Sequence, residues 1–281
     1  MKKILLLTDG SAYSAEAAKY ALWLGSASPV SVTAVYLTDL RQFEIPLMAD
    51  IGGSLGAQPY ADLTAHLRQF EEQKAKLIGE QVSKALGGNP AVAGLNFQHK
   101  TGTLTDCLAQ YEPDTDLVVV GKRGENANFE TEHLGSNLER VLRSSTKPCL
   151  VTNRAFREIK RIAIAYDNSL TSQKAVRWVC SDPAFKRCAI HMVTVAEGGR
   201  EDEASQALRT GEAIARDCGV TPTCQVIGGV LEASITNYVD TNAVDLLVMG
   251  AYGHSRIRYL LIGSATTSMI RSCKIPVLCV R

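Results

Sequence analysis

The same spaced pattern of glycines occurs twice in this chain, and each time a serine ends it. The copies are Gly121-x2-Gly124-x10-Gly135-Ser136 and Gly250-x2-Gly253-x9-Gly263-Ser264. Each copy closes with a proline-led apolar segment, which begins at Pro148 or Pro276. A repeat that fills 281 residues predicts two similar units, since one domain takes about 150 residues.

The repeat also covers the start of each copy. Placing Asp9 on Asp167 is an offset of 167 − 9 = 158 residues, and this offset also aligns Ser14 with Ser172. At the glycines the offset is 250 − 121 = 129, so the first copy contains 158 − 129 = 29 additional residues before that point. A short polar link near 153–158 separates the copies. We therefore expect one domain at residues 1–153 and a second at 158–281.

Short β-rich runs alternate with helical periodicity in both copies. Strands are expected at 3–7, 30–37 and 96–100, and in the second copy from 162, at 189–195 and at 223–227. Helices are expected at 103–111, about 204–218 and 231–239. Residues 38–62 contain prolines and glycines and predict a long surface excursion. The helix after it has apolar residues at Leu63, Leu67, Phe70, Leu77, Ile78 and Val82.

This alternation predicts an α/β fold of two similar domains, each with a five-stranded parallel sheet and helices on both faces. Ligands of such sheets bind at the carboxyl ends of the strands, where the chain order reverses. Asp167 ends the first strand of the second copy, and the glycine loop follows its fourth strand. If those two strands are neighbours, the carboxylate and the loop face one crevice.

The glycine segment has the composition of a phosphate-binding loop. The run 246–249 is short, rich in β-formers and ended by Gly250, which fits a buried strand. Ser264 is suited to cap the next helix. Glycines permit a close approach of the backbone, and free N–H groups at a helix start bind anions. A turn and an ordinary cap would explain each residue alone, but the combination with Asp167 favours nucleotide phosphates.

These motifs resemble the nucleotide loop of the universal stress protein family, and the resemblance covers nearly the whole chain as two tandem copies. It implies a doubly wound fold like that of the adenine nucleotide alpha hydrolases, with the first and fourth strands adjacent. It implies bound ATP, whose adenine is held by backbone groups near Val195, with Asp167 on the adenosine side. Met249 can pack on the base, although a role as a core strand residue is equally open.

The resemblance also assigns the remaining residues of the site. Phosphates would be held by Gly250, Gly253, Gly263, Ser264 and Ala265, with His254 and Arg256 in the same loop. The first-copy counterparts are Asp9, Leu37, Gly121, Gly124, Gly135 and Ser136.

The two copies should not bind nucleotide equally well. In 250–267 the charges of Arg256 and Arg258 sum to +2, whereas in 121–139 two cations face four glutamates and the sum is −2. Because a polyphosphate is negatively charged, it should bind better to the second-copy segment, whose charges sum to +2. The first-copy loop is one residue longer, and Ser136 with Glu139 fits a capping box that would occupy the N–H groups a phosphate needs. We therefore expect the second copy to be the ATP site and the first to be degenerate, although Lys122 and Arg123 could partly offset the difference.

Composition narrows the remaining classes of function. The net charge of +1 gives no electrostatic reason to expect nucleic acid or an anionic membrane, and no apolar stretch approaches the ~18 residues of a membrane span. The eight cysteines include no Cys-x-x-Cys pair, which indicates buried thiols in a reducing cytoplasm. The scattered histidines give little support to a metal site. Motifs of P-loop NTPases, dinucleotide-binding proteins and α/β-hydrolases are absent.

Three functions stay open on the sequence alone. They are an ATP-binding stress-response regulator, a slow ATP-hydrolysing enzyme, and an interaction scaffold that binds no nucleotide. No general base is evident beside the predicted γ-phosphate, which favours binding without turnover. ATP with Mg²⁺, ADP and AMP are all candidate ligands. By the resemblance, the final strands pair the two domains through Leu150-Val151 and Val277-Leu278, and a homodimer of the tandem chain is expected.

Overall fold

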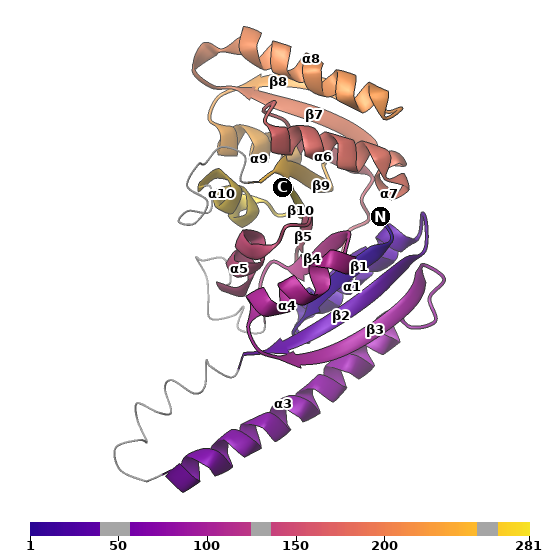
Figure 1. Cartoon of the computed structure of the whole chain (residues 1–281). Helices are drawn as coiled ribbons and strands as arrows, with labels where there is room; N and C mark the ends of the chain where they lie inside the picture. The colour runs from indigo at the N-terminus through magenta and orange to yellow at the C-terminus, as the bar shows by residue number, and fades with distance from the viewer. Residues whose placement is uncertain (40–56, 125–135, 252–263) are drawn as a thin grey trace.

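The computed structural model describes residues 1–39, 57–124, 136–251 and 264–281, and these residues contain one ten-stranded sheet (Figure 1). Its strand order is β3-β2-β1-β4-β5-β10-β9-β6-β7-β8. The first-copy strands are β1 (Lys3–Thr8), β2 (Val30–Thr38), β3 (Val92–Thr101), β4 (Leu117–Gly121) and β5 (Cys149–Thr152). The second-copy strands are β6 (Arg161–Ala165), β7 (Ala189–Ala196), β8 (Thr223–Gly228), β9 (Leu246–Gly250) and β10 (Val277–Val280).

Within each copy all five strands run parallel, and the two copies meet in an antiparallel pair of strands. That pair is β5 with β10, in which Val277 lies opposite Val151 and Leu278 lies opposite Leu150. The predicted contact between the final strands is therefore confirmed. Leu150 and Leu278 are both fully buried, as expected for strands covered by helices on both faces.

Helices cover both faces of the sheet, so the expected α/β fold is confirmed. One face packs against α1 (Ala12–Gly25), α3 (Ala57–Leu86), α6 (Leu170–Ser181), α7 (Pro183–Lys186) and α8 (Glu201–Asp217). The other face packs against α4 (Leu104–Tyr111), α5 (Ser136–Ser144), α9 (Leu231–Thr241) and α10 (Ser264–Ser272). Two 3-10 turns, η1 (Glu112–Asp114) and η2 (Glu197–Gly199), complete the elements of the described chain. Each apolar layer continues from one copy into the other.

Two helix starts differ from the sequence-based expectation by three residues or more. Helix α3 begins at Ala57, so residues 57–62 are helical and not part of a surface excursion. Pro59 lies in the first turn, where the missing N–H has no intrahelical partner, so this proline does not prevent the helix. Helix α8 begins at Glu201, before the expected start at Ala204, because its acidic first turn suits the positive end of the helix dipole. The rest of the predicted excursion, 40–56, lies outside the described residues.

The buried face of α3 also differs from the apolar pattern in the sequence. Phe70 and Leu77 are 60% and 61% exposed. The buried positions of the helix are Glu71, Ala75, Ile78, Val82 and Leu86. A buried glutamate at the N-terminal end of this face is the unusual feature, since an ionisable side chain is seldom buried without hydrogen-bond partners.

Both copies begin with the same turn and helix cap. The hydroxyl of Ser11 accepts the N–H of Ser14 at 3.3 Å, and the hydroxyl of Ser169 accepts the N–H of Ser172 at 3.2 Å. The residue before each cap is in the left-handed region, at φ +77° for Gly10 and +61° for Asn168. The 158-residue repeat thus places Asp9 and Asp167 at equivalent turns between the first strand and the first helix.

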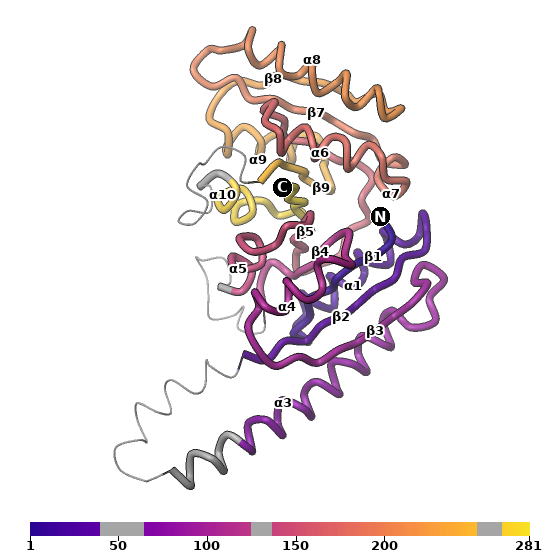
Figure 2. Tube along the Cα trace, viewed as in Figure 1, coloured from indigo at the N-terminus to yellow at the C-terminus, as the bar shows by residue number. Residues whose placement is uncertain are grey.

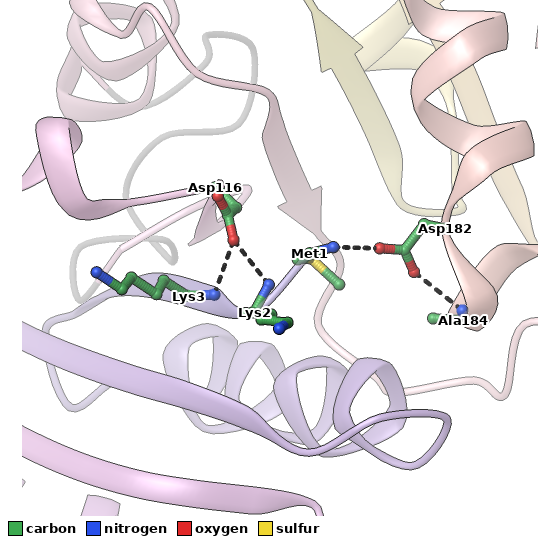
Figure 3. A network of polar contacts seen from close by, with 6 residues as sticks. All are labelled: Met1, Lys2, Lys3, Asp116, Asp182 and Ala184. Atoms are coloured by element: carbon green, nitrogen blue, oxygen red, sulfur yellow. Dashed lines mark hydrogen bonds and ion pairs between the residues drawn. The ribbon is translucent and has the colours of Figure 1, made fainter.

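A carboxylate at the opposite edge of the sheet fixes the start of the first strand in each copy. Asp116 accepts the N–H groups of residues 2 and 3 at 2.7 and 3.0 Å (Figure 3). Asp245 accepts those of residues 160 and 161, both at 3.0 Å. Because these aspartates precede β4 and β9, they hold the first and fourth strands in register.

The two termini lie near the junction of the copies (Figure 2). The amino group of Met1 lies 2.8 Å from Asp182 Oδ2, and the other oxygen of this carboxylate accepts the N–H of Ala184 at 2.9 Å (Figure 3). The side chains of Met1 and Asp182 are only 1% and 8% exposed, and this ion pair joins the chain just before β1 of one copy to the start of α7 in the other.

Candidate functional site

A cavity of about 480 Å³ lies at the carboxyl ends of β6, β7 and β9. Strands β6, β7 and β8 follow one another toward one edge of the sheet, whereas β9 lies on the other side of β6. The chain order therefore reverses between β6 and β9, the position where open parallel sheets bind ligands. The volume falls within the roughly 300–1,000 Å³ of small-molecule sites. The predicted adjacency of first and fourth strands is confirmed in both copies.

Four of the predicted site residues line this cavity: Asp167, Val195, Met249 and Gly250. Pairing of β6 with β7 ends at Ala165 and Val193, and β7 continues to Ala196. Val195 therefore lies beyond the end of β6, beside the opening between β6 and β9. The geometry brings the four residues together, and their binding of a nucleotide stays a prediction.

Asp167 is held in place by the helix that follows it. Its Oδ1 accepts the N–H of Ser169 at 3.0 Å and the hydroxyl of Ser169 at 2.6 Å. Ser169 is buried and caps α6, so the carboxylate lies at the positive end of this helix. These hydrogen bonds fix the orientation of the Asp167 side chain at the cavity wall, although the side chain is exposed.

Gly250 is required by a close approach of β9 to α6. A Cβ atom at this position would lie 2.6 Å from the backbone nitrogen of Ser172 and 2.7 Å from Thr171 Oγ1. Any side chain would push β9 away from the helix start, so this packing already requires the glycine, and its predicted approach to a phosphate stays a prediction. Met249 is 8% exposed and belongs to the apolar layer while also lining the cavity, so both interpretations of it remain.

The end of β7, the turn that follows it, and helices α8 and α9 supply cavity residues that sequence reasoning missed. The apolar ones include Ala204, Ala207, Leu231 and Ile235, and the polar ones include Thr194, Glu197, Arg200 and Glu203. Glu197 Oε1 accepts the N–H of Leu231 at 3.2 Å and so links the end of β7 to the start of α9. No motif marks these positions, because they reach the cavity only through the packing of the helices. Their one sequence signal is that they follow the second and third strands.

The phosphate side of the predicted site lies mainly outside the described residues. Gly253, His254, Arg256 and Gly263 are in residues 252–263. Helix α10 begins at Ser264, the predicted cap position, and Ala265 is its second residue. In the first copy, Gly135 is likewise outside the described residues, and α5 begins at Ser136. The capping box of Ser136 with Glu139 therefore stays a prediction.

The first copy keeps the turn and the glycines but differs around Leu37. Asp9 Oδ1 accepts the N–H of Ser11 at 3.0 Å, as in the second copy. A Cβ atom on Gly124 would lie 2.8 Å from Asp9 Oδ2, and one on Gly121 would lie 2.8 Å from Cβ of Tyr13. Gly121 is therefore needed for the chain to pass this close to the start of α1, whereas a side chain at Gly124 would only displace the carboxylate of Asp9.

Leu37 has neighbours on either side that bind a buried carboxylate. The hydroxyls of Tyr36 and Thr38 donate to Glu71 Oε2 at 2.5 and 2.8 Å, and Glu71 is 8% exposed. Thr38 Oγ1 also lies 3.0 Å from Nε2 of His99. Burial, together with the hydrogen bond to Glu71, raises the pKa of Tyr36 to about 12.

Glu71 occupies the position that Ala204 has in the second copy. The buried residues of α3 and α8 have the same spacing, so Glu71, Ala75, Ile78 and Val82 correspond to Ala204, Leu208, Gly211 and Ala215. The 158-residue offset likewise matches Tyr36 with Thr194 and Thr38 with Ala196. Where the second copy lines its cavity with a methyl group, the first copy thus has a hydrogen-bonded carboxylate.

The family model of the universal stress protein family matches the chain twice, over residues 1–153 and 158–281. The chain belongs to the universal stress protein family. Over 287 aligned residues it is 37% identical to Universal stress protein Slr1230 of Synechocystis, with 100% of both chains covered. The predicted family and its tandem form are therefore confirmed.

Two further comparisons agree with this. Universal stress protein MJ0531 of Methanocaldococcus jannaschii is 30% identical over 166 residues, which cover 56% of this chain and 85% of that protein. The crystal structure of a universal stress protein from Archaeoglobus fulgidus superposes with a TM-score of 0.69 at 18% identity, covering 99% of this chain and 96% of that one. The superposition supports the fold.

The sequence suggested that Lys122 of this universal stress protein could add positive charge to the first-copy loop, but its side chain binds the other copy. Its Nζ donates to the carbonyls of Arg271 and Cys273, at 3.0 and 2.9 Å, at the end of α10 in the other copy. Burial lowers the pKa of Lys122, and the neighbouring Arg123 adds to this. The positive charge of Lys122 therefore lies at the contact between the copies and does not contribute to the first-copy loop.

No helix in the described part of the chain is long and apolar enough to cross a membrane. Among the same residues, no group of three or more His, Cys, Asp or Glu side chains is arranged to hold a metal ion.

Proposed function

We propose that this universal stress protein binds an adenine nucleotide, with ATP as the ligand, in the cavity of its second copy. The observation that carries the proposal is the convergence of Asp167, Val195, Met249 and Gly250 on one cavity at the switch point of the sheet. The sequence motifs and the family resemblance point to these same residues. A chance arrangement would have spread them over separate surfaces.

The chemistry of the cavity suits an adenosine. The apolar side chains of Leu231, Ile235 and Met249 offer surfaces for the flat base. The carboxylate of Asp167 can accept hydrogen bonds from ribose hydroxyls. Backbone groups at the end of β7, near Val195, are placed to pair with the edge of the base.

The phosphates would then extend toward the loop after β9. We assign them to Gly250, Gly253, Gly263, Ser264 and Ala265, with His254 and Arg256 adding positive charge. The start of α10 at Ser264 supports this assignment, because free N–H groups at a helix start bind anions. Mg²⁺ would accompany the phosphates of ATP, whereas AMP would need no metal.

The second copy is proposed as the main site and the first as degenerate, in domains that we delimit as 1–153 and 158–281. The support is the pair Glu71 and Ala204: a carboxylate in the first copy stands where the second has a small apolar residue. A buried negative charge disfavours an anionic ligand, and its hydrogen bonds to Tyr36 and Thr38 occupy the region beside Leu37.

A regulator that responds to the nucleotide is the role we propose, with hydrolysis slow or absent. All eight cysteines are free, which suits a reducing compartment such as the cytoplasm. Pairing of two tandem chains into a homodimer is part of the same proposal. Sedimentation equilibrium would test it, since a purely monomeric mass at micromolar concentration would contradict it.

Nucleotide binding is tested by extracting the purified protein, identifying any retained nucleotide, and then titrating the apo protein. A ligand at 100 times its Kd should raise the free energy of unfolding by about 2.7 kcal/mol, a visible shift in Tm. Asp167→Asn should weaken ATP binding, whereas Asp9→Asn, the matched first-copy change, should leave it unchanged. Equal loss in both variants would overturn the preference for the second copy.

The alternatives give different results in the same experiment. A scaffold that binds no nucleotide would show no shift with ATP, ADP, AMP or GTP. An ATP-hydrolysing enzyme would release phosphate at a rate that Asp167→Glu abolishes. Binding of ATP and ADP without phosphate release is the result expected of a regulator.

A further inference from the structure

An open groove of about 490 Å³ lies beside α6 at the junction of the copies. It shares no lining residue with the proposed nucleotide cavity. Its lining includes Met1, Pro148 and Val280, together with Trp178 and two exposed cations of α6, Lys174 and Arg177. The α6 residues are spaced i, i+3 and i+4, so they lie on one face of the helix. This groove is not used by the function proposed above.

The equivalent face of α1 already binds a piece of the protein's own chain. The 158-residue offset places Glu16 and Tyr20 where α6 has Lys174 and Trp178. Phe156, in the irregular link between the copies, packs edge-on against Tyr20 with ring centroids 4.8 Å apart. Its N–H donates to Glu16 Oε2 at 2.5 Å, and the next N–H, of Arg157, donates to the hydroxyl of Tyr20 at 3.2 Å.

The link thus shows how this helix face binds a non-helical segment: one aromatic ring packs on the helix aromatic, and two backbone N–H groups are hydrogen-bonded. On α6 the same position is an open groove with a half-buried tryptophan. Tryptophan offers a larger ring face than Tyr20 for an incoming aromatic side chain.

The charge of the two faces differs. On α1, Glu16 is paired with Lys19 at 2.5 Å, so that face is close to neutral. On α6 the corresponding residues are Lys174 and Arg177, and neither makes a hydrogen bond or ion pair with a described residue. The nearby Asp182 is already paired with the amino group of Met1. The side chains that line the groove thus include the cations Lys174, Arg177 and Arg281 and the carboxylate of Asp182, so cationic side chains are in excess beside an aromatic ring.

We propose that this groove binds a non-helical acidic segment of a partner protein, with one aromatic side chain packed on Trp178 and its carboxylates facing Lys174 and Arg177. Charge complementarity favours this occupant. The link segment of another molecule of this protein is disfavoured as the occupant. It carries Arg154 and Arg157 beside Phe156, so its binding would bring like charges together.

The probe for the test is the fluorescein-labelled peptide Asn-Glu-Ala-Phe-Glu-Glu, which is the link sequence 153–158 with both arginines replaced by glutamate. It is titrated against the full-length, tag-free protein and followed by fluorescence anisotropy. A tag is avoided because the amino group of Met1 is buried at the groove. We expect saturable binding that weakens about tenfold or more when phenylalanine of the peptide is replaced by alanine.

The protein variants separate the groove from general charge. Lys174→Glu with Arg177→Glu should weaken binding about tenfold or more, and Trp178→Ala should do the same. The control, Arg209→Glu with Lys84→Glu, reverses two exposed charges outside the groove and should leave binding within about twofold of the parent. Thermal melts with and without ATP verify that each variant is folded and keeps its nucleotide site.

Three results would overturn the proposal. The first is no saturable binding of the probe by the parent protein, and the second is equal binding of the alanine peptide. The third is equal weakening in the control variant, which would indicate non-specific attraction. If the groove variants instead had a different assembly mass from the parent protein in sedimentation, another molecule of this protein would be the occupant. None of these results depends on whether ATP binds.

Discussion

The hydroxyl of Tyr36 donates to the carboxylate of Glu71 at 2.5 Å, and both side chains are buried in the first copy. This contact joins the end of β2 to α3 at the place where the second copy has Thr194 and Ala204 beside its cavity. At this place the two copies therefore differ by a buried carboxylate and its hydrogen-bond partners. The first pair of predictions concerns that difference.

Replacing Glu71 by alanine should destabilise the first copy and leave nucleotide affinity unchanged. The change leaves the hydroxyls of Tyr36 and Thr38 without their acceptor, which costs about 1–3 kcal/mol. Urea unfolding measures the loss, and calorimetry with ATP measures the affinity. Tyr36→Phe removes one donor alone and should cost less. A large fall in ATP affinity with Glu71→Ala would place the functional site in the first copy.

Introducing the first-copy residue into the second copy should block the proposed site. Ala204→Glu places a carboxylate in the wall of the cavity and should weaken ATP binding at least about tenfold. Ala204→Gln has nearly the same shape without the charge, so the difference between the two variants isolates the electrostatic effect. Unchanged ATP affinity in Ala204→Glu would contradict the assignment of the cavity to the nucleotide.

The sequence predicted the parts of this protein that depend on local chemistry. The strand that ends at Gly250 was identified from its short apolar run, and the 158-residue repeat predicted equivalent turns at Asp9 and Asp167. The atoms that Gly250 approaches, at Thr171 and Ser172, belong to a helix whose distance from β9 no local pattern encodes.

The buried face of α3 shows why the rest was missed. Hydrophobicity alone selected Phe70 and Leu77, both of which are exposed, and passed over Glu71. A charged residue is buried here because two hydroxyls from another strand satisfy its carboxylate. Such pairing depends on tertiary contacts, which one sequence does not reveal.

Lys122 and Arg281 are expected to stabilise the junction of the copies. Lys122 donates to carbonyls at the end of α10, and Arg281 donates to those of Arg143 and Ser145 at the end of α5. A cation at a helix end is worth roughly 0.3–1 kcal/mol, and its hydrogen bonds add to this. Lys122→Met should therefore lower the free energy of unfolding by about 1–2 kcal/mol. Arg209→Met, on exposed α8 surface, is the control and should change it by less than about 0.5 kcal/mol.

Glu16 gives the contact between the link and α1 a pH dependence. Burial raises the pKa of Glu16, but hydrogen bonds from Lys19 and from the Phe156 N–H outweigh it, so the pKa lies below the ordinary 4.5. Its stabilisation is thus complete above pH 4.5 and is lost as the pH falls through the lower folded-state value. Glu16→Gln should be less stable than the parent at pH 7, and the difference should shrink below pH 4.5 and vanish once the pH is below the lowered folded-state pKa. Thermal melts from pH 3 to 7 measure this, and a constant difference throughout would contradict it.

Asp182 should make the largest single contribution to the contact between the copies. Its carboxylate faces the buried amino group of Met1 at 2.8 Å and also caps α7 through the N–H of Ala184. Asparagine caps a helix as well as aspartate does, so Asp182→Asn removes the charge and keeps the cap. Removing one partner of a buried ion pair costs about 3–5 kcal/mol, because the other charge stays buried. Urea unfolding is measured for parent and variant, each with and without N-terminal acetylation. The four free energies of unfolding separate the interaction between the two charges from the contribution of each group alone. Acetylation should destabilise the parent strongly and the variant little, since the amino charge has lost its partner there. Equal effects of acetylation on both proteins would show that the two groups do not interact.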